Sequence, residues 1–243
     1  MDPLLQARGL YRAFDANVAV EDVSLTVNGG EIVGFLGANG AGKTTTLRML
    51  AGILEPHGGD VHVCGTDMQR DPLVAKARMG FLSGDTHLYP RLSAREIFRY
   101  FGSLYGVEKK RLEQRIETVV KELAMEEYAD RPASTLSAGQ KQRANIGRAF
   151  LHDPEVLILD EPTNALDVLS GRFIVESLRK QRDRGRAILF STHIMSEAEY
   201  LCDRIYMVHK GRVVAEGTPK EIIEHAGQTN LTDAFLYFVE KHA

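Results

Sequence analysis

The sequence lacks tryptophan, has two cysteines (Cys64 and Cys202), and contains no apolar run near the ~20 residues that a membrane-spanning helix needs. Two cysteines without metal-ligand spacing indicate reduced thiols in a cytosolic compartment. The first ten residues, MDPLLQARGL, lack the apolar core of a signal peptide. These absences predict a protein that neither spans a membrane nor is secreted by that route.

An excess of charge of one sign is also missing. Thirty basic and 33 acidic side chains leave a formal net charge of −3, which gives no electrostatic reason to expect nucleic-acid binding. The 243 residues are 44% hydrophobic and 26% charged, which is typical of a globular protein with a sizeable core.

The stretch from Glu31 to Leu50, EIVGFLGANGAGKTTTLRML, has the pattern of a strand, a glycine loop and a helix. Residues 37–44 match G-x-x-x-x-G-K-[ST] at every fixed position. Glycines let the backbone turn its N–H groups inward, and the following helix adds its positive end, so the loop favours an anion. We expect Lys43 to reach the β- and γ-phosphates of a nucleotide and the Thr44 hydroxyl to bind Mg²⁺.

The residues expected to surround the phosphates are Gly37, Ala38, Asn39, Gly40, Ala41, Gly42, Lys43, Thr44 and Thr45. The alternative is a glycine-rich turn that precedes Lys-Thr by chance. The strand before the loop and the helix after it favour the nucleotide site.

Apolar strand patterns alternate with helical patterns along most of the chain. Residues 4–36 form a β-rich entry, in which residues 28–30, Asn-Gly-Gly, have the pattern of a hairpin turn into the strand before the loop. Further apolar strands are expected at 79–83, 156–159 and 187–190. We predict an α/β fold: a P-loop NTPase core, whose mostly parallel sheet has helices on both faces, with an antiparallel β subdomain and an inserted α-helical subdomain.

The helical subdomain is expected at about residues 84–155. Capping boxes open two of its helices, at Ser93 with Glu96 and at Ser137 with Gln140. The expected helices are 93–105, with Ile97, Phe98, Phe101, Leu104 and Tyr105 on its apolar side, the amphipathic 108–128, and 137–152. Another helix is expected at 173–184. No linker divides the chain, so we predict a single domain over 1–243 with a short tail at about 219–243.

A second chemical motif, VLILDE, places Asp160 and Glu161 at the end of an apolar strand. Ligands of open α/β sheets bind at the carboxyl ends of strands. We expect Asp160 to help hold Mg²⁺ and Glu161 to act as the general base that activates water. On its own the pair could simply start a turn before Pro162, and the glycine loop makes the catalytic interpretation the stronger one.

Together, these motifs resemble the nucleotide-binding subunit of ABC transporters. The resemblance adds LSAGQKQR at 136–143, LILDEPTNALD at 157–167 and STH at 191–193, and it covers nearly the whole chain. The signature helix is its most specific element, since other P-loop enzymes lack it. Ala138 stands where the family usually has glycine, and because its Cβ is small we expect the function to survive.

The resemblance implies further roles. The helix start, with Ser137, Gly139 and Gln140, would bind the γ-phosphate of ATP held by a partner subunit, so that a head-to-tail dimer encloses two ATP molecules. His193 would contact the γ-phosphate and orient the water with Glu161, and Asp167 would communicate across the dimer. For Phe14 two interpretations remain open: an aromatic that stacks on adenine, or a core residue.

One position departs from the family pattern. The family has a glutamine that ligates Mg²⁺ and senses the membrane subunit, and this position is Gly84 here. Asp85 or a water molecule would have to replace that contact. The surrounding GFLSGDTHLYPRLSARE resembles the sodium-extrusion branch of the family.

The resemblance implies an ATPase that uses ATP and Mg²⁺ to drive transport, in the direction of export, through a separate polytopic membrane subunit. It would lie on the cytoplasmic face of the membrane, paired with a second nucleotide-binding subunit, identical or different, and without a nucleic-acid partner. The alternative is a soluble ABC-type ATPase that acts as a nucleotide switch in protein or cofactor assembly.

Overall fold

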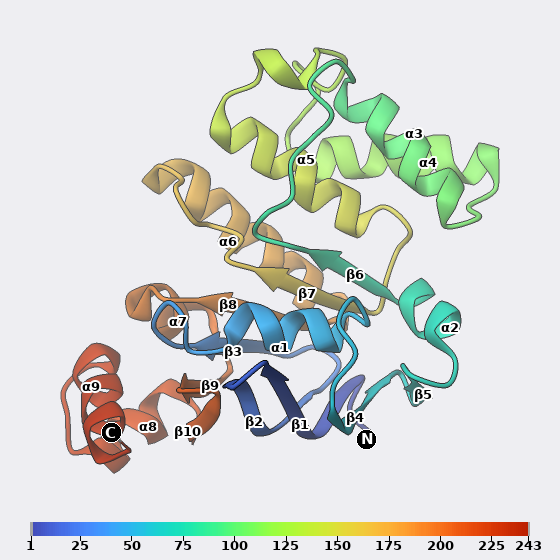
Figure 1. Ribbon diagram of the computed structural model, residues 1–243. Helices are drawn as coiled ribbons and strands as arrows, with labels where there is room; N and C mark the ends of the chain where they lie inside the picture. The colour runs from blue at the N-terminus through green and yellow to red at the C-terminus, as the bar shows by residue number, and fades with distance from the viewer. Residues whose placement is uncertain (1, 243) are drawn as a thin grey trace.

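The computed structural model describes residues 2–242, and within that range the strands form two sheets (Figure 1). One sheet is antiparallel, with strand order β2-β1-β4-β5. Its strands are β1 (Leu5–Phe14), β2 (Asn17–Val27), β4 (Gly58–Val63) and β5 (Thr66–Asp67).

The other sheet has the order β10-β9-β3-β8-β7-β6, in which the strands from β9 to β6 run parallel and β10 is antiparallel to β9. Its strands are β3 (Ile32–Leu36), β6 (Met79–Leu82), β7 (Val156–Asp160), β8 (Ala187–Thr192), β9 (Arg204–His209) and β10 (Arg212–Gly217).

Helices cover both faces of this larger sheet. Helix α1 (Lys43–Leu50) lies between the two sheets, and α5, α6 and α7 pack on the opposite face, while α3 and α4 stand at the top of the view and α8 and α9 at the lower left (Figure 1). The remaining helices are α2 (Pro72–Ala77), α3 (Ala94–Leu104), α4 (Lys109–Glu122), α5 (Ala138–Phe150), α6 (Val168–Arg182), α7 (Met195–Leu201), α8 (Pro219–Ala226) and α9 (Leu231–Lys241).

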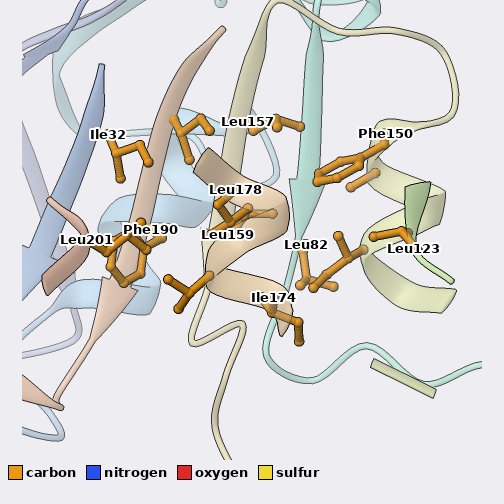
Figure 2. Close-up of a cluster of buried hydrophobic side chains, with 14 of the residues drawn as sticks. Ile32, Leu82, Leu123, Phe150, Leu157, Leu159, Ile174, Leu178, Phe190 and Leu201 are labelled. Atoms are coloured by element: carbon orange, nitrogen blue, oxygen red, sulfur yellow. The ribbon is translucent and has the colours of Figure 1, made fainter. Parts of the chain in front are cut away.

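The strand before the glycine loop, β3, contributes side chains to a hydrophobic cluster on each face of the larger sheet. Ile32 and Leu36 join the cluster on the side of α5 and α6, whereas Val33 and Phe35 join the cluster around α1. Because side chains alternate along a strand, a strand buried on both faces must be apolar throughout, and β3 is fully buried. Figure 2 shows the first cluster, where strand residues meet Ile174 and Leu178 of α6.

The predicted fold class is confirmed, and both capping boxes form as predicted. The predicted hairpin at Asn28–Gly30 is wrong. β2 pairs with β1, whereas β3 pairs with β8 and β9, so this turn connects two different sheets. Its sequence fits a tight turn, and Gly30 has a φ of 73°, but turn chemistry does not determine which strands pair.

Two helix boundaries also differ from the prediction. Helix α4 ends at Glu122, before a left-handed residue, Ala124. Helix α6 begins at Val168 rather than 173, because the Asp167 carboxylate accepts a hydrogen bond from the Ser170 N–H and caps it. On α3, Leu104 and the following Tyr105 are 65% and 42% exposed, so they do not join the core as their spacing predicted.

Candidate functional site: a nucleotide-binding loop and its neighbours

The glycine loop between β3 and α1 is shaped by close backbone contacts. Gly42 has a φ of 101°, and a Cβ on it would lie 2.5 Å from the Ala19 carbonyl oxygen. A Cβ on Gly37 would lie 2.5 Å from the Val208 carbonyl oxygen. At these two positions only glycine fits, which explains the fixed glycines of the motif.

Lys43, the first residue of α1, points its ammonium back into the loop. Its side chain is 5% exposed, and Nζ donates hydrogen bonds to the carbonyl oxygens of Gly37 (2.8 Å) and Ala38 (3.1 Å). Burial lowers the pKa of Lys43, and the carboxylates of Glu161 and Asp160 oppose that shift. The Lys43 Nζ therefore lies in the loop as a hydrogen-bond donor. An anion bound there would replace the two backbone carbonyl oxygens as its acceptors.

A cavity of about 360 Å³ opens over this loop. Its lining combines loop residues with segments that are distant in sequence, on β2 and at the β9–β10 turn. The lining residues are Asn17, Val18, Ala19, Asn39, Gly40, Gly42, Lys43, Thr44, Thr45, Glu161, Lys210 and Gly211. Phosphate-binding and general-base candidates thus share one space.

A neighbouring cavity of about 370 Å³ brings Thr44 together with Asp160 at the carboxyl end of β7. Asp160 is 3% exposed, and its Oδ1 accepts a hydrogen bond of 2.6 Å from the Ser191 hydroxyl. A hydroxyl and a carboxylate are hard oxygen donors that suit Mg²⁺. Within residues 2–242 no group of three or more His, Cys, Asp or Glu side chains could hold a metal.

Glu161 and His193 meet at the ends of the adjacent strands β7 and β8. Glu161 Oε1 lies 3.2 Å from His193 Nδ1 and 3.7 Å from Lys43 Nζ. The Glu161 backbone is left-handed, with a φ of 46°, and its N–H donates to the Ser191 hydroxyl at 3.0 Å. An uncommon backbone conformation that aims a carboxylate at a binding loop is typical of functional sites.

The signature residues lie away from this loop. Ser137 caps α5, with the Gln140 N–H donating to its hydroxyl, and neither residue lines the cavity over the loop. Ala138 is exposed as the first helical residue, so its Cβ causes no clash. A Cβ on Gly139 would meet the Ser170 hydroxyl at 2.4 Å, which places the start of α5 against the start of α6.

Asp167 belongs to the same surface as the signature residues. Its carboxylate accepts hydrogen bonds from the Ser170 N–H (2.9 Å) and hydroxyl (2.7 Å), and these bonds lower its pKa. The next two residues, Val168 and Leu169, are 85% and 80% exposed. Exposed apolar side chains beside a signature helix are what a protein interface would cover.

Phe14 is 44% exposed, so the core interpretation of this residue is wrong. It lies at the end of β1, paired with Asn17, which lines the cavity over the loop. The Arg12 guanidinium lies 5.0 Å from the centre of its ring. Stacking of this ring on adenine stays a prediction.

Gly84 lies beside the expected metal position. A Cβ on it would stand 3.7 Å from the Asp160 carboxylate, in ordinary van der Waals contact. The correspondence of this position to the family's glutamine stays a prediction. Gly84 and Asp85 both line the cavity of about 370 Å³ beside Asp160. The Asp85 side chain is 81% exposed, however, and its carboxylate accepts a hydrogen bond from the Arg48 guanidinium at 2.6 Å.

Sequence reasoning assigned no role to Ser191, which binds both the Asp160 carboxylate and the Glu161 N–H. Gln142 was also missed; its amide donates to the Pro162 carbonyl at 2.7 Å and lines the cavity beside Asp160. These contacts join residues 20 to 31 positions apart. No local pattern in the sequence signals them.

Comparison with known proteins identifies the family of this chain. A protein-family model described as "ABC transporter" matches residues 20–164. The ABC transporter ATP-binding protein NatA of Bacillus subtilis (strain 168) is 42% identical over 219 residues, covering 90% of this chain and 89% of that protein. The Nod factor export ATP-binding protein I of Ralstonia nicotianae is 36% identical, covering 92% of this chain and 70% of that protein.

Solved structures give the same result. The ATP-binding subunit of an ABC transporter superposes with a TM-score of 0.88 at 32% identity, over 97% of this chain and 99% of that one. An ATP-binding cassette in its ADP conformation has a TM-score of 0.81 at 21% identity, which shows the shared fold. No helix among the described residues is long and apolar enough to cross a membrane. This chain belongs to the ABC transporter family, as an ATP-binding subunit with ATPase activity.

Proposed function

We propose that this subunit powers export through a separate membrane protein, with Mg²⁺ as cofactor and a second copy of the chain completing each ATP site. The observation that carries the proposal is the convergence of Lys43, Asp160, Glu161 and His193 at the carboxyl ends of β3, β7 and β8. One of the relatives described above is named as an ABC transporter protein, which supports transport, and the other is named for export, which supports this direction.

Each residue has a separate task in hydrolysis. Lys43 and the loop N–H groups bind the β- and γ-phosphates, and Thr44 and Asp160 hold Mg²⁺, which offsets charge on the phosphates. Glu161 accepts the proton of the attacking water, and His193, 3.2 Å from it, holds that carboxylate and the water in line with the γ-phosphate.

The signature residues require a second subunit. Because Ser137, Gly139 and Gln140 lie away from the cavity over their own loop, they would act on ATP bound by a partner. Asp167 lies on the same face. A twofold head-to-tail dimer places both sets over two ATP molecules, and hydrolysis would separate the subunits again.

The surface proposed for the membrane subunit lies between α1 and the helical subdomain. A cavity of about 310 Å³ there is lined by Ile53, Phe101 and Tyr105 among others. Ile53, Tyr105 and the nearby Leu104 are 61%, 42% and 65% exposed. Such a set of exposed apolar side chains beside a hollow suits a segment of another protein. The subunit would thereby be held at the cytoplasmic face of the membrane.

Replacing Leu104 by Lys tests this surface. A cation at the end of α3 suits the helix dipole, so the fold should survive, whereas a charge placed in an apolar interface should reduce recovery of the membrane subunit about 10-fold or more. The measurement is affinity purification of the tagged protein from its native membranes in gentle detergent. Leu236→Lys on α9, 51% exposed, is the control.

In this experiment the wild-type protein and Leu236→Lys should recover a polytopic membrane protein that Leu104→Lys loses. Recovery of soluble partners alone, with the wild-type protein absent from membranes, would contradict the transport proposal and favour a soluble assembly ATPase. Equal recovery by all three proteins would contradict only the proposed surface.

Restoring the family's glutamine at Gly84 tests the metal position. The site is open, so Gly84→Gln should fold normally and add an oxygen ligand, lowering the Mg²⁺ concentration for half-maximal ATPase activity about 3- to 10-fold. Gly84→Ala, which adds only the Cβ, should leave this concentration unchanged. If both variants behave alike, Gly84 does not border the metal site.

A further inference from the structure

Two threonines flank the residues that we assign to catalysis, and a single carboxylate joins them. Thr163 follows Glu161 by two positions after β7, and Thr192 immediately precedes His193 at the end of β8. The hydroxyls of Thr163 (2.9 Å) and Thr192 (3.1 Å) both donate to Oε2 of Glu197, in the first turn of α7.

We propose that Glu197 is a positioning residue for ATP hydrolysis, which fixes the Glu161 loop against the His193 loop. The inference rests on the roles proposed above for Glu161 and His193. The 3.2 Å contact between them joins two chain segments, one after β7 and one after β8. Its geometry therefore depends on the contacts that hold these two segments together past the ends of the strands.

The surroundings of Glu197 argue against a merely local role. An acidic residue in a first turn often accepts a hydrogen bond from the N–H of the residue that precedes its helix, but the N–H of that residue in α7, Ile194, does not donate to Glu197. The Ile194 N–H donates instead to the Thr192 hydroxyl at 3.0 Å. The Glu197 carboxylate therefore accepts hydrogen bonds from the two threonine hydroxyls. Thr163 and Thr192 are 8% and 2% exposed, so water has little access to replace the carboxylate as their acceptor.

The network also explains how His193 is aimed. The Thr192 hydroxyl donates to Glu197 and accepts from the Ile194 N–H, so it holds the backbone on both sides of His193. On the other strand, the Thr163 hydroxyl holds the turn that follows the left-handed Glu161. Removing the shared acceptor frees both segments together.

The test measures steady-state ATP hydrolysis by the purified full-length chain. Glu197→Ala should lower kcat about 10- to 30-fold with KM for ATP changed less than about 2-fold, because phosphate binding by Lys43 is untouched. Glu197→Gln keeps a carbonyl acceptor for both hydroxyls and should recover kcat to within about 3-fold of wild type. Glu199→Ala, an exposed residue of the same helix, is the matched control and should match wild type.

The comparison between the Gln and Ala variants separates the alternatives. Gln removes the charge that interacts with the dipole of α7, so an equal loss in both variants would show a role in helix electrostatics and overturn the proposal. An equal fall in kcat and in ATP affinity would show general disruption of the site and would also overturn it.

A second set covers the case in which Glu197→Ala does not fold. Thr192→Val removes the hydroxyl while keeping the branched shape of the side chain, whereas Thr192→Ser keeps the hydroxyl. The kcat of Thr192→Val should be at least about 10-fold lower than that of Thr192→Ser. Equal effects would contradict the proposal.

A double variant links the effect to Glu161. In the Glu161→Gln background, Glu197→Ala should cause no further loss of kcat, since it acts through a residue already disabled. An additive loss would show that Glu197 acts elsewhere. If Glu161→Gln alone keeps wild-type turnover, the proposed general base is wrong, and this result is distinguishable from a failure at Glu197.

Discussion

Glu161→Gln is expected to lower kcat about 10²- to 10⁴-fold while ATP affinity stays within a few-fold of wild type. Glutamine keeps the size of the side chain but cannot accept the proton of the attacking water. The phosphates would still meet the loop N–H groups and Lys43, whose Nζ is also held by the carbonyl oxygens of Gly37 and Ala38. Release of phosphate measures kcat, and titration with a fluorescent ATP analogue measures affinity.

The control for this variant is Glu155→Gln. Glu155 precedes β7 at the opposite end of the strand, where it pairs with Arg78 on the surface, so its neutralisation should leave turnover unchanged. Wild-type turnover in Glu161→Gln would contradict the assignment of the general base.

Lys43→Ala is expected to weaken ATP binding about 10²-fold or more, because charge-assisted hydrogen bonds to two phosphates are lost at a buried position. The wild-type protein should be stabilised by ATP by about 2.7 kcal/mol when ATP is at 100 times its dissociation constant. At the same ATP concentration the variant should show little of this gain. Thermal unfolding with and without ATP measures it.

Lys220→Ala provides the control, since this lysine on α8 is 85% exposed and pairs with Glu224 at 3.8 Å. It should keep the full response to ATP. A response in Lys43→Ala equal to that of wild type would contradict the nucleotide site at the glycine loop.

The sequence allowed the prediction of features whose cause is local. The left-handed backbone at Gly42, with a φ of 101°, belongs to a short motif, and the capping box at Ser137 is complete within four residues. The alternation of helices with apolar strands likewise follows from periodicity. Such features were predicted correctly because each depends on neighbouring residues.

Other features depend on which strands become neighbours. β7 and β8 pair in parallel register, with Asp160 opposite Ser191, and this register brings Ser191 and His193 to the carboxylates. The same cause explains the incorrect hairpin before β3, whose partners are β8 and β9. Contacts such as those of Glu197 follow from sheet order, which no short motif encodes.

The central claim, that two copies enclose ATP between loop and signature helix, is tested most directly by the solution mass of Glu161→Gln. With saturating ATP and Mg²⁺, light scattering should give twice the 27.0 kDa of the single chain, and with ADP it should give the single chain. Adding Ser137→Arg, which places a bulky side chain on the proposed interface, should prevent the dimer without abolishing ATP binding. A mass of one chain for Glu161→Gln with ATP bound would contradict the account.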